Sequence, residues 1–576
     1  MMPVRNGEVA EKFDTMADLL AIKDANRFRI RAYRNGANTI RDLSENVGDM
    51  VDQDQDLTQL PDIGKDLANK IEEIVETGSL SALEELKGQV PGQLTELMDI
   101  DQLGPKRVKK IYQELGITSI DDLKEAAEEE EIEELEGLGE KTEDKIIKDI
   151  QRHKEEEHDR YKISIGEEYA EPLVDYLDNV DGVKKVTVAG SFRRRLETVG
   201  DLDILVLCDD PEKVMDKFVQ YEDVERTVSK GDTRSTVVLD NEFHVDVRIV
   251  PEESYGAAMH YFTGSKDHNI AMRKLAKDNG WKLSEYGLFK DDDNRLAGKT
   301  EEEIYDKFNM DWIPPELREN SGEIEAAKKG QLPHLVTTDD IKGDLHVHTY
   351  RTDGKLDLET IAESAKKMGY KYLAITDHSK RVTMANGLDQ DELEEQIAEI
   401  DKINEKIDDF TFLKGIEVDI LKDGSLDLDE DILEKLDLVI AAVHYNRNLE
   451  KEEQTKRVLE ALENEYVNIL AHPLGRFIQE REPLELDLNQ IMEKAKEEGC
   501  FLELNAHPKR LDLSDTNCKL AKEKGVKVVI STDTHKKSHF DNIRYGVDQA
   551  RRGWLEPEDV LNTRSLDQLL ELLEVE

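Results

Sequence analysis

The sequence predicts a multidomain protein with three successive architectures: a helical region, an α+β region and a parallel βα barrel. The chain has 576 residues, more than one hydrophobic core usually serves, because domains typically span about 100–200 residues. Residues 1–160 show short helical patterns, and from about residue 161 strand-like and helical runs mix. After residue 341, seven strand-like runs alternate with helical ones, which is typical of a closed parallel barrel. Residues 311–340 show no clear period and are predicted to form a linker.

The chain is strongly acidic, with 131 Asp and Glu against 79 Lys and Arg and a formal net charge of −52. One interpretation is that the protein repels nucleic acid. We favour another, a halophilic protein, because concentrated salt screens charge repulsion to a few ångströms and acidic surfaces stay soluble there. The composition therefore predicts a protein that stays active in molar KCl.

Several classes of protein are not expected from this sequence. The first residues, "MMPVRNGEVAEKF", lack the apolar stretch of a signal peptide. No apolar run approaches the roughly 20 residues that span a bilayer. The three cysteines, Cys208, Cys500 and Cys518, form neither a disulfide framework nor a CxxC zinc motif. We expect a cytoplasmic protein that does not bind membranes.

Three segments of the helical region share one pattern, an apolar residue, a tight turn that ends in glycine, and then a helix. They are residues 57–78, 97–116 and 132–150. The segments resemble helix-hairpin-helix elements, in which backbone N–H groups of the turn hold a phosphate oxygen without reading a base. One such segment could be an ordinary helical turn, but three in one region favour binding to the DNA backbone.

Glycines and one basic stretch are the candidate DNA contacts of these hairpins. Glycine lets a phosphate approach the backbone closely. "GPKRVKK" of the second hairpin is locally basic, as a phosphate-facing turn should be. Only the third hairpin has the full Gly-x-Gly form. The predicted contacts are Gly64, Gly104, Lys106, Gly137 and Gly139.

The stretch "VGDLDILV" holds two aspartates, Asp201 and Asp203, in an otherwise apolar run. Residues i and i+2 of a strand face the same side, so the two carboxylates project together. A third acid, Asp246, lies in the strand-like run "FHVDVRIV". The alternative is an exposed strand face of an acidic protein. Three converging carboxylates are costly unless cations neutralise them, so we expect two Mg²⁺ or Mn²⁺ here.

Two further motifs identify the family that this region resembles. "AGSFRRRLETVGDLDILV" resembles the active-site motif of the nucleotidyltransferase superfamily, and a Gly-Ser turn that opens a helix can cradle a triphosphate. "YFTGSKDHNIAMRKLA", residues 261–276, resembles DNA polymerase family X, the family of DNA polymerase beta. The resemblance covers roughly residues 1–320 and includes the hairpins.

The resemblance to family X implies roles for individual residues. Tyr261 and Phe262 match a pair that packs against the incoming sugar, and Asn269 matches a contact to the incoming base. Arg273 matches a contact to the template strand, and Arg248 follows the third aspartate as in the family. Nucleotide binding is implied for Gly190, Ser191, Arg194, Tyr261, Phe262, Gly264 and Asn269, and DNA binding for Arg248 and Arg273.

Lys70 matches the position at which lyase domains of the family keep a Schiff-base lysine. A lysine beside an abasic-site aldehyde acts as a nucleophile once its pKa falls. A solvent-facing helix lysine is the alternative, and Asp66 stands where the family has a basic residue. Lys70 is therefore the candidate nucleophile for lyase activity, and it has no other predicted catalytic role.

Eight of the fourteen histidines follow residue 341, and most stand where a strand-like run ends. The strand ends of a βα barrel meet at one rim, where active sites lie. Imidazoles with carboxylates suit Zn²⁺, Mn²⁺ or Fe²⁺. His507 and His539 do not fit the pattern. Nine residues are predicted ligands of two or three ions: His346, His348, Asp353, His378, Glu417, His444, His472, Asp533 and His535.

This region resembles the PHP (polymerase and histidinol phosphatase) domain, and all nine metal positions of that family are matched. The resemblance implies a distorted (β/α)7 barrel with two or three Mn²⁺ or Zn²⁺ ions that hydrolyses phosphoesters, with 3′→5′ exonuclease activity and cleaning of 3′ ends. Cleavage at abasic sites could accompany these activities.

Together the resemblances predict a monomeric repair polymerase that fills short gaps in DNA from dNTPs, with a nuclease domain attached. The alternatives are a small-molecule nucleotidyltransferase fused to a phosphatase, and a polymerase with a purely structural PHP domain. The expected segments are 1–90 (lyase-like, with the first hairpin), 91–160 (further hairpins), 161–250 (nucleotidyltransferase palm), 251–320 (thumb-like nucleotide selection), 321–340 (linker) and 341–576 (PHP).

Overall fold

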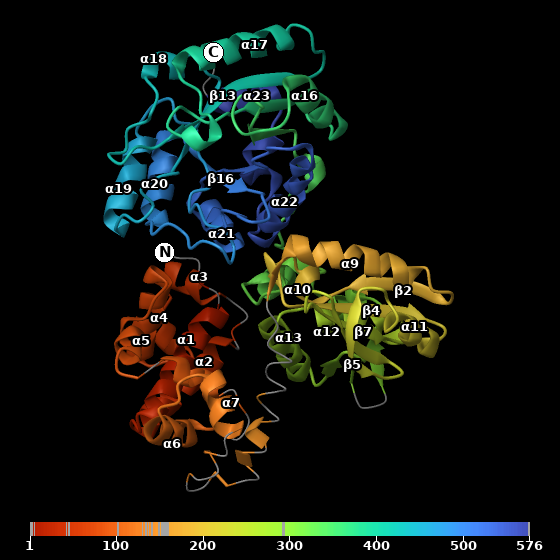
Figure 1. Ribbon diagram of the computed structural model, residues 1–576. Coiled ribbons are helices and arrows are strands. Elements are labelled where there is room, and N and C mark those ends of the chain that lie inside the picture. Colours follow the sequence, from red (N-terminus) through yellow and green to blue (C-terminus); the bar gives the residue numbers. More distant parts are fainter. Residues whose placement is uncertain are drawn as a thin grey trace. The chain divides into compact units, whose positions relative to one another are not determined.

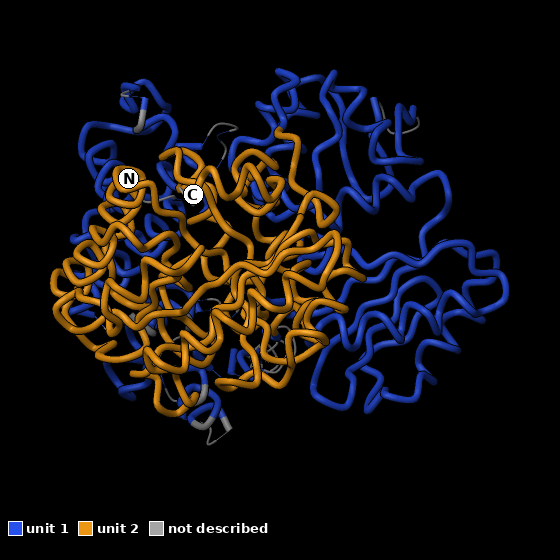
Figure 2. Tube along the Cα trace, turned by 90° about the horizontal axis from the view of Figure 1, so that it is seen from above, with its two compact units in different colours: residues 1–161, 165–194, 198–332 blue, residues 162–164, 195–197, 333–576 orange. Residues whose placement is uncertain are grey.

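The computed structural model describes residues 4–573 with short gaps. The residues left out are 5, 42, 44–45, 54, 91, 99, 101–102, 129–130, 133–134, 136–137, 140–141, 144, 148–149, 151–159 and 291–293. The chain divides into two compact units, shown in blue and orange in Figure 2. Unit 1 comprises residues 1–161, 165–194 and 198–332, and unit 2 comprises residues 162–164, 195–197 and 333–576. No helix in the described ranges is long and apolar enough to cross a membrane.

Unit 1 begins with short helices around a single apolar core. Amphipathic patterns produce them: α4 buries Leu67, Ile71 and Ile74 on one face, and ends at Gly78, whose φ of 72° suits glycine. The helices are α1 (Asn6–Ile22), α2 (Arg27–Arg41), α3 (Val47–Asp52), α4 (Lys65–Thr77), α5 (Ser81–Lys87), α6 (Pro105–Leu115) and α7 (Ile120–Glu128), with 3₁₀ turns η1 (Leu57–Gln59) and η2 (Gly92–Met98).

The middle of the chain forms a five-stranded sheet of order β2-β4-β7-β6-β5. The central strands β4 and β7 run parallel, and the other neighbouring pairs are antiparallel. The strands are β2 (Val183–Val188), β4 (Asp201–Cys208), β5 (Val224–Lys230), β6 (Arg234–Leu239) and β7 (His244–Ile249). The helices α9 (Ile163–Asp178), α10 (Gly190–Arg193) and α11 (Pro211–Phe218) and the short pair β1 (Tyr161–Lys162) and β3 (Thr198–Val199) complete this part.

A smaller helical part with a three-stranded antiparallel sheet follows. It contains η3 (Glu252–Ser254), α12 (Tyr255–Thr263), α13 (Lys266–Asp278), β8 (Lys282–Ser284), β9 (Gly287–Phe289), β10 (Arg295–Ala297) and α14 (Glu301–Lys307). The structure differs from the linker expected over residues 311–340, because η4 (Pro315–Leu317), α15 (Glu323–Lys329) and η5 (Thr338–Asp340) lie there. Glu323 is fully buried, 2.6 Å from His268 Nδ1, a contact that helical periodicity does not reveal.

Unit 2 is a nearly closed barrel of seven parallel strands in chain order, which confirms the fold predicted from the alternating pattern. The first and last strands meet at one end, where His348 N donates to Thr534 O at 2.9 Å. The strands are β11 (Gly343–Val347), β12 (Tyr372–Ile375), β13 (Thr411–Asp419), β14 (Leu438–Ala442), β15 (Ile469–Leu470), β16 (Phe501–Asn505) and β17 (Val528–Ser531).

Helices surround this barrel (Figure 1). Side chains from all seven strands fill the interior together with Leu569 and Leu573 near the C-terminus. A second, larger apolar cluster joins strands to the outer helices. The helices are α16 (Leu358–Lys367), α17 (Gln390–Asn404), α18 (Glu430–Leu433), α19 (Lys451–Leu462), α20 (Leu488–Glu498), α21 (Asp515–Lys524), α22 (Ile543–Arg552) and α23 (Leu566–Leu572), with 3₁₀ turns η6 (Thr383–Ala385), η7 (Lys537–Asn542), η8 (Pro557–Asp559) and η9 (Leu561–Thr563).

Candidate active sites

The parallel strands β4 and β7 bring the three predicted aspartates of unit 1 together. Asp203 and Asp246 are direct partners in the register, and Asp201 lies two residues before Asp203 on the same face. Burial, together with the charges of Asp201 and Asp246, raises the pKa of Asp203 to about 7. Carboxylates held this close in a poorly solvated place are suited to divalent cations, which remove the cost of their repulsion.

Neighbouring groups hold Asp246 in place. Arg234 Nη2 lies 3.0 Å from Asp246 Oδ2, and the Thr236 hydroxyl donates to Asp246 Oδ1. Arg248 Nη2 lies 3.8 Å from the same carboxylate, and its guanidinium stacks 4.5 Å from the Phe262 ring centre. Arg248 therefore joins the acidic strand pair to the segment that carries the Tyr-Phe motif.

The first turn of α10 packs directly on this acidic site. Gly190 has a φ of 62°, and a Cβ there would lie 2.9 Å from Asp203 Oδ2, so only glycine fits. Ser191 follows, half-buried, in the same turn. Arg194 already has protein partners, because it donates to Thr263 O at 2.7 Å and pairs with Glu319 Oε1 at 2.9 Å. A triphosphate would have to compete with Glu319 for this guanidinium.

The Tyr-Phe motif ends α12 and is braced by Asn269 of α13. Asn269 Nδ2 donates to Tyr261 O at 2.7 Å and to Gly264 O at 2.9 Å. A Cβ on Gly264 would lie 2.8 Å from His268, so a larger residue would displace α13. Arg273 is exposed one turn further on, where its Nε donates to Asn269 O. The structure thus brings the predicted nucleotide contacts of this segment into one turn.

The hairpin glycines begin helices and lie open to solvent. Gly64 precedes α4 and Gly104 precedes α6, and neither helix has a side chain that caps its first N–H groups. A Cβ at Gly64, Gly104 or Gly139 would meet nothing within 4 Å. Free N–H groups at an open helix start can hold a phosphate oxygen. Gly137, the other glycine of the third hairpin, lies outside the described residues.

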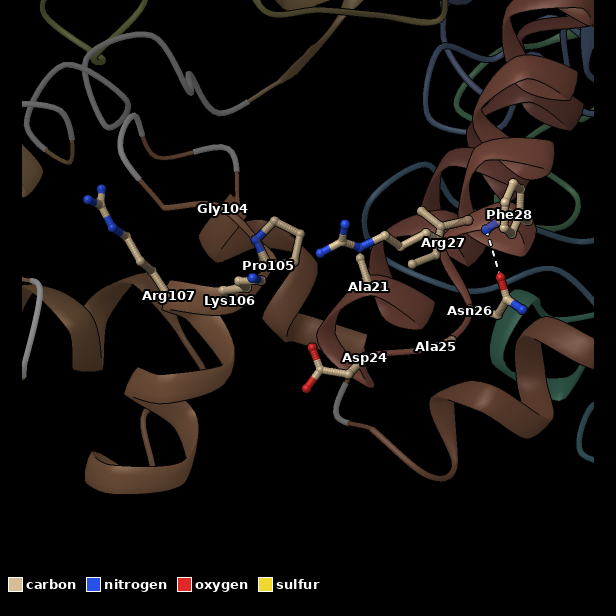
Figure 3. A pocket seen from close by; sticks show the side chains of 11 residues that line it. Ala21, Asp24, Ala25, Asn26, Arg27, Phe28, Gly104, Pro105, Lys106 and Arg107 are labelled. Atoms are coloured by element: carbon tan, nitrogen blue, oxygen red, sulfur yellow. Dashed lines mark hydrogen bonds between the residues drawn. The ribbon is translucent and has the colours of Figure 1, made fainter.

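A pocket of about 1040 Å³ adjoins the second hairpin (Figure 3). Lys106 and Arg107 line it from α6, and Arg27 and Phe28 line it from the start of α2. The Phe28 side chain is 83% exposed. A basic pocket with an exposed aromatic ring is typical of surfaces that contact nucleic acid.

Lys70 lies on α4 with its ammonium 2.5 Å from Asp66 Oδ1. The Lys70 side chain is 15% exposed. A Schiff-base lysine attacks a carbonyl with its free amine, and in this structure the Lys70 amine is engaged by the Asp66 carboxylate. Asp66, which stands where the family has a basic residue, is therefore placed to oppose Schiff-base formation by Lys70.

In unit 2 the nine predicted ligands meet at the carboxyl end of the barrel, from the ends of six strands and one loop. Eight of them form three overlapping groups whose ligand atoms lie within 4.8 Å of one another. The ninth, His472, has its Nε2 3.0 Å from Glu417 Oε1. The groups are His348, Asp353, His378 and His535; His346, His348 and Asp533; and His378, Glu417 and His444. We name these nine residues the histidine cluster.

Glu417 lies at the centre of the histidine cluster and faces imidazoles with both carboxylate oxygens. Oε1 lies 3.3 Å from His444 Nε2 and 3.0 Å from His472 Nε2, and Oε2 lies 2.8 Å from His378 Nδ1 and 3.4 Å from His346 Nε2. Burial raises the pKa of Glu417, but the imidazoles outweigh burial and hold it well below its usual range. An ionised carboxylate with this surrounding can bridge two cations.

Unpartnered atoms show that the histidine cluster fits metal ions. Several buried ring nitrogens and one carboxylate oxygen have no hydrogen-bond partner among the described residues, although they approach one another closely. Buried atoms without hydrogen-bond partners are expected where their lone pairs are used to bind a metal ion and not to accept a hydrogen bond. The atoms are His346 Nε2, both ring nitrogens of His348, His378 Nδ1, His472 Nδ1 and Glu417 Oε2.

Two buried acids behind the histidine cluster were not predicted from the sequence. Glu503 Oε1 lies 2.7 Å from His346 Nδ1, and Asp419 Oδ1 lies 3.2 Å from His444 Nδ1. Such partners fix the orientation of an imidazole and leave its other nitrogen for a metal. The sequence feature that could have identified them is an acid within an otherwise apolar strand. Glu503 lies in "CFLELN" and Asp419 in "GIEVDI". His539, set aside in the sequence, accepts from His535 N at 3.3 Å.

Comparison with known protein families agrees with this division of the chain. Family models match for a helix-hairpin-helix domain over residues 4–80 and a SAM-like helix-hairpin-helix tandem over residues 94–152. The DNA polymerase beta palm matches residues 166–250, and the DNA polymerase beta thumb matches residues 258–319. The PHP domain matches residues 344–507. The acidic site thus lies in the palm and the histidine cluster largely in the PHP domain.

Curated relatives cover either the whole chain or parts of it. The chain is 38% identical over 562 residues to the DNA polymerase/3′-5′ exonuclease PolX of Bacillus subtilis (strain 168), covering 97% of both chains. It is 32% identical over 233 residues to a probable phosphatase of Thermoanaerobacter sp. (strain X514), covering 38% of this chain and 89% of that protein. It is 29% identical over 298 residues to DNA polymerase lambda of Arabidopsis thaliana, covering 46% of this chain and 53% of that protein. The resemblance predicted from the motifs is confirmed, and the chain belongs to the family X DNA polymerases that carry a C-terminal PHP domain.

Proposed function

We propose that this polymerase fills short gaps in DNA at the acidic site of unit 1 and removes nucleotides from 3′ ends at the histidine cluster of unit 2. The observation that carries the proposal is that unit 1 places Asp201, Asp203 and Asp246 on one face of two paired strands, whereas unit 2 brings groups of histidines and acids within 4.8 Å of one another. The similarity to PolX of B. subtilis, named a polymerase and 3′-5′ exonuclease, supports both activities. A small-molecule transferase would not need the hairpins.

For gap filling, Asp201, Asp203 and Asp246 would hold two Mg²⁺ or Mn²⁺ ions. Such a pair activates the attacking 3′-hydroxyl and stabilises the leaving pyrophosphate. Gly190 lets the triphosphate approach the backbone, and Ser191 and Arg194 bind its oxygens once Arg194 exchanges Glu319 for phosphate. Tyr261 and Phe262 pack on the sugar of the incoming dNTP. Asn269 keeps that turn rigid through its two backbone contacts.

For DNA binding, Gly64, Gly104 and Gly139 offer open backbone N–H groups to phosphates, with Lys106 adding charge. Gly137 is assigned to the same role by its motif alone. Arg273 would contact the template strand, and Arg248 would contact the DNA. None of these contacts depends on base identity, which suits a repair enzyme that acts at any sequence.

For the nuclease reaction, the histidine cluster would hold two or three Mn²⁺ or Zn²⁺ ions. These ions supply a hydroxide nucleophile at neutral pH and neutralise the leaving oxygen. Glu417 would be one of the residues that hold these ions, and Glu503 and Asp419 fix the imidazoles of His346 and His444. The intact set of ligands argues against a purely structural PHP domain.

The proposal is tested by the substrates that the full chain uses. Gapped duplex, primer-template duplex and single strands, each labelled at the 5′ end of the primer, are incubated with Mn²⁺ and single dNTPs. We expect addition of the templated nucleotide on the gapped duplex and stepwise loss of 3′ nucleotides from single strands. Nucleotide addition without a template, or cleavage of small phosphomonoesters alone, would contradict the proposal.

Lyase activity is a separate prediction that concerns Lys70. If Lys70 attacks the aldehyde of 5′-deoxyribose phosphate, borohydride traps wild type on that substrate, and Lys70→Ala abolishes trapping. Asp66→Ala should increase trapping several-fold, because it releases the Lys70 amine from its contact with the Asp66 carboxylate. Equal trapping of wild type and Lys70→Ala would exclude Lys70 as the nucleophile. Lys65→Ala, on the same helix, is the matched control.

A further inference from the structure

Three arginines from three loops of unit 2 meet around one phenylalanine. Arg447 follows β14, Arg481 lies between β15 and α20, and Arg510 follows β16. The guanidinium carbons of Arg481 and Arg510 lie 3.8 Å and 4.7 Å from the centre of the Phe477 ring. Arg447 packs against Gly475, where an added Cβ would lie 2.3 Å from its Nη1. We name Arg447, Arg481 and Arg510 the arginine cluster.

The positive charges of the arginine cluster are poorly balanced by the protein. In the described part of the chain, neither Arg447 nor Arg481 has a carboxylate within 4.0 Å, and the buried Nε of Arg481 has no hydrogen-bond partner. Burial, together with the charges of Arg447 and Arg510, lowers the pKa of Arg481 to about 10. Burial and Arg510 also lower the pKa of Arg447. Gathering like charges costs free energy that a bound anion would recover.

A second buried acid near the arginine cluster, Asp512, is engaged by the backbone. Both of its carboxylate oxygens accept from Leu474 N, at 3.3 Å and 3.0 Å. Burial raises the pKa of Asp512 to about 6, which shows that the neighbouring arginines do not fully stabilise its charge. Asp512 therefore shapes the loop instead of neutralising the arginine cluster.

The arginine cluster borders the histidine cluster. Arg510 Nε lies 3.6 Å from Oδ2 of Asp533, one of the nine candidate metal ligands. Arg447 follows another, His444, by three residues. An anion on the arginine cluster would therefore lie beside whatever phosphoester the histidine cluster holds.

The chemistry of the arginine cluster selects phosphate. Stacking on Phe477 fixes two guanidinium planes and leaves their N–H edges free to donate. Fixed guanidinium forks match the paired oxygens of a phosphate group. We propose that the arginine cluster binds a phosphodiester of the DNA strand next to the one that is cleaved; this inference rests on the proposed nuclease function.

The test uses methylphosphonate linkages, which remove the charge of one chosen phosphate. The full chain with Mn²⁺ degrades 5′-labelled single strands that carry one neutral linkage at the second, third or fourth position from the 3′ end. We expect kcat/KM for release of the last nucleotide to fall about tenfold or more in wild type at one of these positions. Arg481→Ala should show a similar fall on the all-phosphate strand, mainly in KM, and no further fall at that position.

Matched variants separate this role from folding and from metal binding. Lys509→Ala removes a neighbouring cation that is 54% exposed and pairs with Glu480, and it should behave as wild type. Arg481→Lys should recover part of the lost kcat/KM. Metal content and nucleotide addition should be unchanged in Arg481→Ala. If wild type shortens no strand, the proposed function fails; if Arg481→Ala keeps wild-type kcat/KM or its sensitivity to the neutral linkage, only the arginine assignment fails.

Discussion

Glu417 is the residue on which the histidine cluster depends most. It faces four imidazoles from β11, β12, β14 and β15 ends at 2.8–3.4 Å, and it is 1% exposed. If Glu417 had no charge, the histidine cluster would lose a candidate metal ligand. The surrounding imidazoles would also lose the carboxylate that balances their positive charge. Four imidazoles of the histidine cluster thus share one carboxylate near the carboxyl end of β13.

Glu417→Gln should therefore lose metal. Elemental analysis of the purified full chain should show at least one fewer Mn²⁺ or Zn²⁺ per chain than wild type, and 3′ nucleotide release should fall at least a hundredfold. Glu482→Gln, an exposed acid of the same unit, is the control and should keep wild-type metal content. Unchanged metal content in Glu417→Gln would contradict the bridging role.

The candidate ligands could be predicted at the residue level because strand ends of a parallel barrel converge. His346, His378 and His444 each follow an apolar run, so their meeting needed only the topology. Glu503 and Asp419 could not be assigned, because their role depends on which imidazole lies across the barrel. The arginine cluster could not be predicted either, because its members are far apart along the chain. Arg447 and Arg481 are separated by 34 residues, and Arg481 and Arg510 by 29.

At the scale of elements, a buried ion network joins α10, α12, α14 and the residue after η4. Arg193 donates to Glu301 through both terminal nitrogens, at 2.9 Å and 2.7 Å, and to the Thr263 hydroxyl at 2.8 Å. Arg318, fully buried, approaches Glu301 Oε1 at 2.5 Å. Glu301 thereby fixes α10 against the helix that carries the Tyr-Phe motif.

Glu301→Gln should destabilise unit 1 by about 3 kcal/mol, because it leaves the buried guanidinium of Arg318 and the partly buried guanidinium of Arg193 uncompensated. Burial raises the pKa of Glu301, but Arg318 and Arg193 outweigh burial and hold it well below its ordinary value. A lowered folded-state pKa contributes stability above about pH 4.5 that is lost as pH falls.

Urea unfolding followed at several pH values tests this network. The difference between wild type and Glu301→Gln should be largest near pH 7 and shrink below about pH 4.5. Glu302→Gln, its exposed neighbour, should unfold as wild type does. A difference that is independent of pH would contradict a role for the ionised carboxylate.

Among the helices, those that follow a local motif could be predicted from the sequence, whereas α15 could not. The hairpin helices α4 and α6 follow their glycines as the motif requires, because the pattern is local. The segment 321–340 was expected to be a linker, yet α15 packs through the buried Glu323 against His268, 55 residues earlier. A buried pair of this kind carries no local signal.

At the scale of the whole molecule, the net charge of −52 bears on where the protein works. Electrostatic attraction to DNA would be weak for such a chain, and in strong salt counterion release adds little. We expect nucleotide addition to be retained within about twofold from 0.2 to 2 M KCl. The measurement is gap filling across that range, with thermal unfolding as a parallel readout. Loss of activity above a few hundred millimolar, without unfolding, would contradict a halophilic protein.

The central claim is that one chain carries two independent active sites of opposite effect. It is tested most directly on a single 5′-labelled gapped duplex, incubated with and without dNTPs, with wild type, Asp203→Ala and His346→Ala. We predict that Asp203→Ala shortens the primer but never extends it, and that His346→Ala extends the primer but never shortens it. Loss of both activities in either variant, or nuclease activity retained in His346→Ala, would contradict the claim.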